Sequence, residues 1–369
     1  MVRPSRTNPS TEGVNLPPTC LLCQMVIPST YDTGIADTKE EDQLLKDRQP
    51  WKSYWRSSHK HVMVPSARVE EADFGDLPRL WSCFCRAIIK ESDTKYRLTG
   101  INMVQHKASD PYNFPTDPNV ARIGGRRNGR CDPQIFTSCM AARPGRQPVK
   151  YKGKRLGFII HAHCWVLFGR TIETPLIEIN LERFIKALRS HWRKSKLKDL
   201  VDDKFYLTPG PNQVSPELQL GCDIHRNPVI VPVLQKVITD ALNRDDFSTH
   251  PQACFDRLPA ELTHLISEWV LPIEYTSDDV RNMRNMLLAF GWDLPGWFWR
   301  RRLAEDLFFE LEVLRKSCFP PPAWMKLQMM RLDVMYLTFD RTWYPHSGLA
   351  NRKRILESIV AIKNGLGIV

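Results

Sequence analysis

The sequence predicts a mixed α+β protein, in which a Cys/His-containing N-terminal domain with a long irregular insertion precedes a mainly α-helical C-terminal domain. The first observation is length, because 369 residues exceed what one hydrophobic core usually organises. The second is an ordinary globular composition, with 42% hydrophobic and 25% charged residues. The third is a change of pattern, from a Pro-, Gly- and Arg-rich stretch at 109–155 to successive helical patterns beyond residue 250.

The N-terminal half divides into an arm and one interrupted domain. Residues 1–18 are rich in Pro, Ser, Thr and Asn, lack the apolar core of a signal peptide and predict a flexible arm. Residues 19–200 form the Cys/His-containing domain, and we expect its basic insertion at 109–155 to lack regular structure. In Leu80–Thr99 apolar and polar residues alternate imperfectly, so this segment fits either a helix or a strand. A helix is predicted where apolar residues recur at helical spacing, at Leu181, Phe184, Ile185, Leu188 and Trp192.

The C-terminal half reads as a linker followed by helices. Residues 201–250 contain many Pro and Gly and predict an irregular linker with a short helix. In the region 251–305, Pro259 suits the first turn of a helix and Asp278 offers an N-cap for the next one. A third helix is predicted within this region at Pro295–Leu303, and two more form a C-terminal region at 306–369, at Ala323–Phe339 and at Leu349–Asn364, where Gly365 can stop the last one.

Charge and cysteine content restrict the environment and the partners. The net charge of +11 attracts acidic surfaces without implying sequence recognition, and the segment Arg122–Arg155 holds ten of the basic residues against Asp132 alone. The longest apolar window, Gly157–Phe168, is too short to cross a bilayer. Ten cysteines without an export signal predict reduced thiols or metal ligands, so we expect a cytoplasmic or nuclear protein.

Two separated pairs of residues have the spacing of metal ligands. Cys20 and Cys23 form a Cys-x-x-Cys pair, which lets two thiolates approach one tetrahedral ion from a tight turn. His161 and Cys164 offer the same spacing, and His163 competes with His161 because only one of them can occupy the ligand position. Together the pairs predict a closed site with three cysteines and one histidine, which is typical of structural zinc.

Other interpretations of these residues stay open. Cys20 and Cys23 could be small hydrophobic residues, with His161 as a buried core histidine. Cys164 beside the histidines is the enzymatic alternative, although nearness in sequence does not bring reactive atoms together. Four more cysteines, interpreted as core or loop residues, leave other ligand sets open: Cys83, Cys85, Cys131 and Cys139.

The basic insertion raises a second kind of function. Arg126, Arg127 and Arg130 lie in or beside the glycine-rich run Gly124–Gly129, which lacks the Lys-Ser/Thr ending of a phosphate-binding loop. Few aromatic residues interleave with these cations, so a solvated loop is the favoured interpretation and nucleic-acid binding the alternative.

A short helical motif follows residue 257. Leu258-Pro259-Ala260-Glu261-Leu262, continued by Ile266, Val270 and Val280, resembles the opening of an F-box. A short amphipathic helix cannot bury its apolar face alone, so it must dock on its own domain or in a partner's groove. The same residues also make an ordinary helix start whose apolar side would simply be core.

The resemblance extends over most of the chain to fungal F-box-like proteins of uncharacterised type. It is carried by short pieces in a fixed order: Cys20-Leu21-Leu22-Cys23, Trp81–Ile88, Leu98-Thr99-Gly100, His161–Trp165, the motif from Leu258, and Leu294-Pro295 with Phe298, Trp299 and Arg302. The sequence departs from the pattern at Pro272–Ser277, which lengthens one connection, and in the arginine-rich segment near Gly125.

This resemblance implies a substrate receptor without catalytic residues of its own. Such a protein would bind a Skp-type adaptor of a cullin-RING ubiquitin ligase and present an unknown target protein. The implied adaptor-binding residues are Leu258, Pro259, Leu262, Ile266, Val270 and Val280. The competing interpretation is an interaction protein with structural zinc, or a basic nucleic-acid-binding protein, with no link to a ubiquitin ligase.

Overall fold

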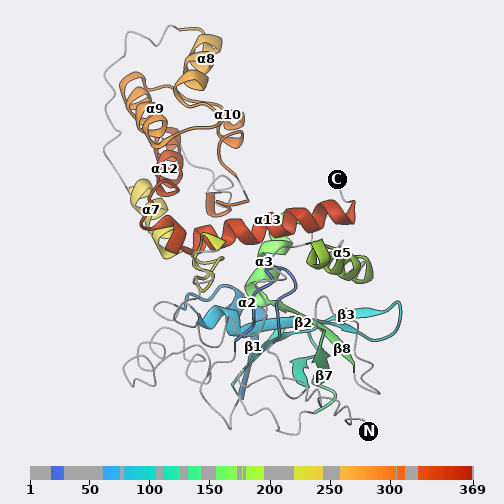
Figure 1. Cartoon of the computed structure of the whole chain (residues 1–369). Helices are drawn as coiled ribbons and strands as arrows, with labels where there is room; N and C mark the ends of the chain where they lie inside the picture. Colours follow the sequence, from blue (N-terminus) through green and yellow to red (C-terminus); the bar gives the residue numbers. More distant parts are fainter. Residues whose placement is uncertain are drawn as a thin grey trace, which may run out of the picture. The chain divides into compact units, whose positions relative to one another are not determined.

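The computed structural model shows a mixed α/β protein with a curled sheet and many helices, as the sequence predicts (Figure 1). It describes residues 18–28, 61–74, 79–104, 111–124, 132–142, 155–172, 177, 180–194, 220–243, 258–304, 306–311 and 323–367. The chain forms two compact units that are each discontinuous in sequence. Unit 1 comprises Met1–Trp165, Pro175–Gln213 and Ile362–Val369, and unit 2 comprises Val166–Thr174 and Val214–Ala361. Among the described residues, none of the helices combines the length and the apolar character that a membrane span needs.

Unit 1 is built on a sheet of eight strands within the described residues. Their order is β1-β6-β4-β2-β8-β7-β5, and β3 pairs with β2 outside this path. Only the pairs β4–β6 and β7–β8 are parallel. The strands are β1 (His61–Pro65), β2 (Phe84–Lys90), β3 (Tyr96–Leu98), β4 (Ile101–Met103), β5 (Tyr112–Pro115), β6 (Val120–Gly124), β7 (Phe136–Ala141) and β8 (Leu156–His161).

The central strands β2 and β8 are buried on both faces. Their register places Cys85 opposite His161 and Ile88 opposite Phe158. A strand covered on both sides has no polar face, so its sequence shows no clean alternation. This explains why Leu80–Thr99 fits no single period, since it contains a 3-10 turn at Leu80–Cys83 followed by β2 and β3.

The expectation that residues 109–155 lack regular structure is wrong. Strands β5, β6 and β7 all lie within that range, and Phe114, Ala121 and Ile123 from them are buried. Each strand is short and is stabilised by partners far away in sequence, as β6 is by β1 and β4. Such pairing leaves a weak local pattern, and the surrounding Pro, Gly and Arg residues obscure it.

Two helices follow β8 in sequence. The first, α3 (Ala162–Thr171), begins at once, without a connecting loop. The second, α5 (Leu181–Lys194), confirms the predicted helix, and its apolar side is buried. Its Trp192 donates a hydrogen bond from Nε1 to the backbone oxygen of Leu21 at 2.9 Å.

Unit 2 is helical within the described residues, apart from turns. Its helices are α7 (Pro232–Asn243), α8 (Ala260–Val270), α9 (Ser277–Phe290), α10 (Gly296–Arg300) and α12 (Ala323–Leu337), and it contains most of α13 (Gly348–Leu366). Helix α9 is capped by Thr276 with Asp279 in a reciprocal capping box, so Asp278 is not the cap. Helix α13 continues through Gly365, and the left-handed residue after it is Gly367, at φ +65°.

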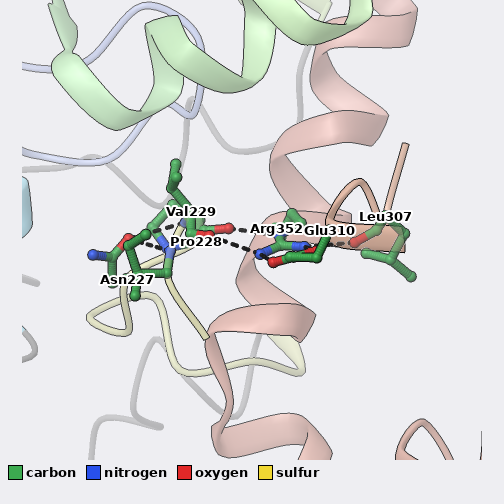
Figure 2. A network of polar contacts seen from close by, with 7 residues as sticks. Asn227, Pro228, Val229, Leu307, Glu310 and Arg352 are labelled. Atoms are coloured by element: carbon green, nitrogen blue, oxygen red, sulfur yellow. Dashed lines mark hydrogen bonds and ion pairs between the residues drawn. The ribbon is translucent and has the colours of Figure 1, made fainter. Parts of the chain in front are cut away.

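A fully buried arginine connects three separate segments of unit 2 (Figure 2). Arg352 of α13 donates to the backbone oxygens of Pro228 at 2.6 Å, Val229 at 2.9 Å and Leu307 at 2.7 Å. It also donates two hydrogen bonds to the carboxylate of Glu310, at 2.7 and 2.9 Å. A buried charge is costly unless it is paired and fully hydrogen-bonded, and Arg352 meets both conditions.

Candidate metal centre and outward-facing helix

Four buried side chains from two remote parts of the chain converge in unit 1. The ligand atoms of Cys20, Cys23, His161 and Cys164 all lie within 4.8 Å of one another. His161 Nδ1 is 3.3 Å from Cys23 Sγ and 3.8 Å from Cys164 Sγ, so Nδ1 is the nitrogen that faces the thiols. The predicted ligand set is therefore brought together, and it could hold a metal ion.

The first pair of cysteines lies on a tight turn. Cys20 N donates to Met25 O at 2.8 Å, and Gln24 N donates to Cys20 O at 2.9 Å. Gln24 adopts the left-handed conformation, with φ 63°, which non-glycine residues seldom adopt. The chain reverses at this residue, immediately after Cys23, so both thiols of the turn can reach one centre.

The second pair lies where β8 passes into α3. His161 is the last residue of the strand, and Cys164 belongs to the first turn of the helix, where the helix dipole favours a thiolate. The cysteine turn is hydrogen-bonded to this strand, through Leu21 N to Ile159 O at 3.0 Å and through His161 N to Cys20 Sγ at 3.3 Å. The sheet therefore fixes the position of both pairs.

The electrostatics of the cluster favour a positive charge at its centre. Burial opposes ionisation of Cys23, but hydrogen bonds from Cys164 and Cys20 and the charge of His161 lower the pKa of its thiol well below the usual value. Burial alone would lower the pKa of His161, yet the neighbouring Cys20 and Cys23 raise it to about 10. A metal cation would supply the positive charge that the protonated imidazole otherwise provides.

His163, the alternative ligand, lies outside the cluster. Its ring packs at 5.8 Å from that of Trp81 and at 5.9 Å from that of Phe74. Burial, together with the charge of His161, lowers the pKa of His163 to about 3, so the ring is neutral. Neither ring nitrogen has a hydrogen-bond partner among the described residues. The geometry thus favours His161 as the ligand and gives His163 an aromatic packing role.

Among the described residues, no further cysteine belongs to the cluster. Cys83, Cys85 and Cys139 are buried, which agrees with their interpretation as core residues, and Cys131 lies outside the described residues. Burial raises the pKa of Cys139 to about 12 and that of Cys85 well above its usual value. Burial and the neighbouring cysteines likewise raise the pKa of Cys164, which disfavours a free nucleophilic thiolate at that position.

Helix α8 has an inverted arrangement of polar and apolar residues. Its buried residues are the small polar Thr263, 8% exposed, and Ser267, 0% exposed. The large apolar side chains face outward, with exposed fractions of 45% for Leu262, 61% for Leu265, 40% for Ile266 and 91% for Trp269. We call these four residues the α8 surface.

Local hydrogen bonds allow α8 to bury its hydroxyl groups. Ser267 Oγ donates to Thr263 O at 2.8 Å, so this hydroxyl needs no partner outside the helix. At the end of α8, Arg302 Nε donates to Leu271 O at 2.5 Å and Arg302 Nη1 to Phe298 O at 3.0 Å, which links α8 to α10. Arg302, one of the residues that carry the F-box-like resemblance, is therefore a buried structural residue.

The predicted adaptor-binding residues divide into three groups. Pro259, Leu262 and Ile266 are exposed, Leu258 and Val270 are half-buried, and Val280 is buried. The α8 surface therefore does not include Val280. Leu265 and Trp269 are absent from the predicted set, although their spacing from Leu262 places them on the same side of a helix.

The basic residues proposed for nucleic-acid binding, Arg126, Arg127 and Arg130, lie outside the described residues. Comparisons with protein-family models, with curated proteins and with solved structures found no match for this chain. The features of the described residues that bear on function are the metal-ligand cluster and the exposed apolar side of α8.

Proposed function

We propose that this protein is an F-box-like substrate receptor, in which the α8 surface binds a Skp-type adaptor of a cullin-RING ubiquitin ligase. The observation that carries the proposal is the inversion of α8, which buries Thr263 and Ser267 and exposes its large apolar residues. A helix that packs only within its own domain normally does the reverse. The resemblance of Leu258–Leu262 to the opening of an F-box supports a Skp-type adaptor as the partner that would cover this side.

The α8 surface is continuous along the helix. At 100° per residue, its four side chains fall within a stripe roughly 100° wide, which is the width of an ordinary buried helix face. Burying one such side chain contributes roughly 1.5–3 kcal/mol. Because the four side chains are exposed, this free energy of burial becomes available only when a partner covers them. Scattered apolar residues on a surface need no explanation, but a contiguous stripe does.

Charge contributes little to this proposed contact. The sequence of α8 contains Glu261 and Glu268 but no Lys or Arg, so the basic excess of the chain is not located on this helix. Binding by apolar burial depends weakly on salt, whereas binding of nucleic acid falls steeply as salt rises. Salt dependence therefore separates the receptor interpretation from the nucleic-acid interpretation.

We further propose that the metal is zinc and that its role is structural. Three thiolates and one imidazole form a ligand set that suits zinc. Four protein ligands leave no open position for substrate or water, which is the arrangement of structural sites. Bound zinc would hold the Cys20–Cys23 turn against β8 and α3 and so brace unit 1, which would present the target protein.

Adaptor binding by purified full-length protein tests the proposal. We expect wild-type protein to retain a Skp-type adaptor in a pull-down, and we expect the double substitution Leu265→Ser with Trp269→Ser to abolish retention. Both residues are exposed, so the substitutions leave the fold intact. The matched control, Val233→Ser with Val360→Ser, removes two exposed apolar residues of unit 2 that lie on α7 and α13. It should bind like wild type.

Two results would count against the receptor function. One is a folded wild-type protein that does not retain the adaptor. The other is retention that persists at wild-type level in the Leu265→Ser, Trp269→Ser variant. Either result would leave the α8 surface as a docking site for some other protein.

A further inference from the structure

Helix α5 separates apolar and cationic residues almost completely. One side is buried and consists of Leu181, Phe184, Ile185, Ala187, Leu188 and Trp192. The exposed residues on the opposite side are Arg183, Lys186, Arg189, Ser190, Arg193 and Lys194, and Glu182 and His191 are half-buried. Five of the six exposed residues are cations, and we call these five the α5 cationic face. An ordinary solvated helix instead mixes both signs of charge.

Most of the cations on this face have no ion-pair partner among the described residues. Lys186 pairs with Glu182 at 2.7 Å. Within the described part of the chain, the other four cations form no ion pair. These four like charges repel one another, which costs stability, and the helix dipole offsets this repulsion only for Arg193 and Lys194 in the last turn. An external anion would relieve this repulsion, so the arrangement is better suited to binding than to folding.

The helix that carries these cations is held firmly in unit 1. Its apolar side is buried, and Trp192 bonds to Leu21 O in the turn that carries Cys20 and Cys23. The candidate metal centre therefore anchors one end of α5. A fixed backbone reduces the entropy lost when a flexible ligand binds to the side chains.

The dimensions and chemistry of the α5 cationic face fit a short acidic peptide. From Arg183 to Lys194 the helix rises about 16 Å at 1.5 Å per residue. An extended peptide covers this length with about five residues at roughly 3.3 Å each. Three of the five cations are arginines, whose guanidinium groups bind carboxylates or phosphates through paired hydrogen bonds.

Nucleic acid fits this face less well. Single-stranded binding relies on aromatic side chains that stack on bases, and base readout in duplexes uses side chains such as Asn and Gln. Neither type occurs among the exposed residues of α5, and the ring of His191 is half-buried. The five cations of this face are also fewer than the roughly six to ten phosphate contacts over which DNA binding becomes steeply salt-dependent.

We propose that the α5 cationic face is the site that recognises the target protein, through a short acidic or phosphorylated segment of that target. The proposal rests on the receptor function, because it assigns the second binding surface that a receptor needs. The receptor then has an apolar surface on α8 for the adaptor and a cationic surface on α5 for the target.

Fluorescence polarisation with a labelled peptide of alternating glutamate and serine tests this assignment. A phosphoserine version of the peptide and a labelled DNA duplex serve as parallel probes. The test variant is Arg189→Gln with Arg193→Gln, which keeps good helix formers at both positions. The control is Arg68→Gln with Arg341→Gln, which removes the same charge from exposed positions outside α5.

We expect the full-length protein to bind at least one of the two acidic peptides, and the α5 variant to bind it at least about tenfold more weakly. The control variant should stay within about twofold of wild type. Equal weakening by both variants would mean that only net charge is sensed, and it would overturn the proposal. So would the absence of peptide binding, or tighter binding of duplex DNA that depends on Arg189 and Arg193.

Adaptor retention, measured on the same proteins, separates failure of this inference from failure of the receptor function. The α5 variant should retain the adaptor fully, because α5 and α8 belong to different units. Peptide binding without adaptor retention would refute the receptor role while keeping α5 as an acidic-peptide site. Adaptor retention without peptide binding would refute the α5 site alone.

Discussion

At the scale of single residues, two histidines that are nearly adjacent in sequence have opposite roles. His161 ends β8 and turns Nδ1 toward Cys23, whereas His163 enters α3 and packs against Trp81 and Phe74. The neighbouring thiols raise the pKa of His161 to about 10, and burial lowers that of His163 to about 3. A strand end followed directly by a helix sends alternate side chains in different directions.

This difference predicts distinct effects on metal content. We expect purified wild-type protein to contain about one zinc per chain by elemental analysis, because the site offers four ligands. His161→Ala should lose most of this metal and melt at a lower temperature, since metal binding contributes to folding. His163→Phe places another aromatic ring between Trp81 and Phe74 and should keep the zinc. Full occupancy in His161→Ala would exclude His161 as a ligand.

At the scale of the element, α8 reverses the usual relation between polarity and burial. Thr263 and Ser267 lie inside, and Leu265 lies outside. A sequence pattern alone does not reveal this reversal, because the same residues predict an amphipathic helix whose apolar side is core. Packing decides the orientation, because the side of α8 that carries Thr263 and Ser267 is the buried one.

The inversion predicts an unusual response to substitution. Thr263→Leu adds apolar volume but should destabilise the protein by about 1–3 kcal/mol, because Thr263 is buried and a larger side chain forces its neighbours to shift. Leu265→Ser replaces an apolar residue by a polar one and should change stability by less than about 0.5 kcal/mol. Chemical denaturation of both variants measures these effects. The opposite ranking would mean that α8 buries its apolar side in solution.

The start of α9 depends on its N-terminal cap. Thr276 caps the helix and forms the capping box with Asp279, whereas Asp278 makes only an exposed ion pair with Arg281. Thr276→Ala should therefore cost about 1 kcal/mol of stability. Asp278→Ala should cost clearly less, about 0.3 kcal/mol. Denaturant midpoints of the two variants, each compared with wild type, decide which residue is the cap.

At the scale of the whole molecule, buried polar groups connect segments that are far apart in the sequence. In unit 1 the candidate metal centre joins residues 20–23 to residues 161–164. In unit 2 Arg352 joins the segment Pro228–Val229 to Leu307 and Glu310. The candidate metal centre and the Arg352 network each fix the position of an irregular segment, which has no helical or strand hydrogen bonds to fix it.

We expect removal of the Arg352 guanidinium to lower the free energy of unfolding strongly. Arg352→Met should cost about 3–5 kcal/mol, because it leaves Glu310 and three backbone oxygens without their donor. Adding Glu310→Gln to Arg352→Met should recover part of this loss, since the uncompensated carboxylate is then removed. Thermal or urea unfolding of both variants provides the measurement. A loss below about 1 kcal/mol would show that water replaces the guanidinium easily.

The local features of this protein are predictable from its sequence. Helical spacing predicts α5 and α8, Pro259 predicts the start of α8, and the Cys-x-x-Cys and His-x-x-Cys spacings predict the ligand set Cys20, Cys23, His161 and Cys164, with His163 as a competitor of His161. These features depend on neighbours within a few residues, so the local pattern carries enough information.

Tertiary structure alone decided the features that depend on distant partners. Strands β5, β6 and β7 form where composition predicted irregular chain, because remote strands complete their hydrogen bonds. The choice of His161 over His163 and the outward orientation of the α8 surface were also decided by packing. In each case the deciding free energy comes from contacts between segments far apart in the chain, which no local pattern records.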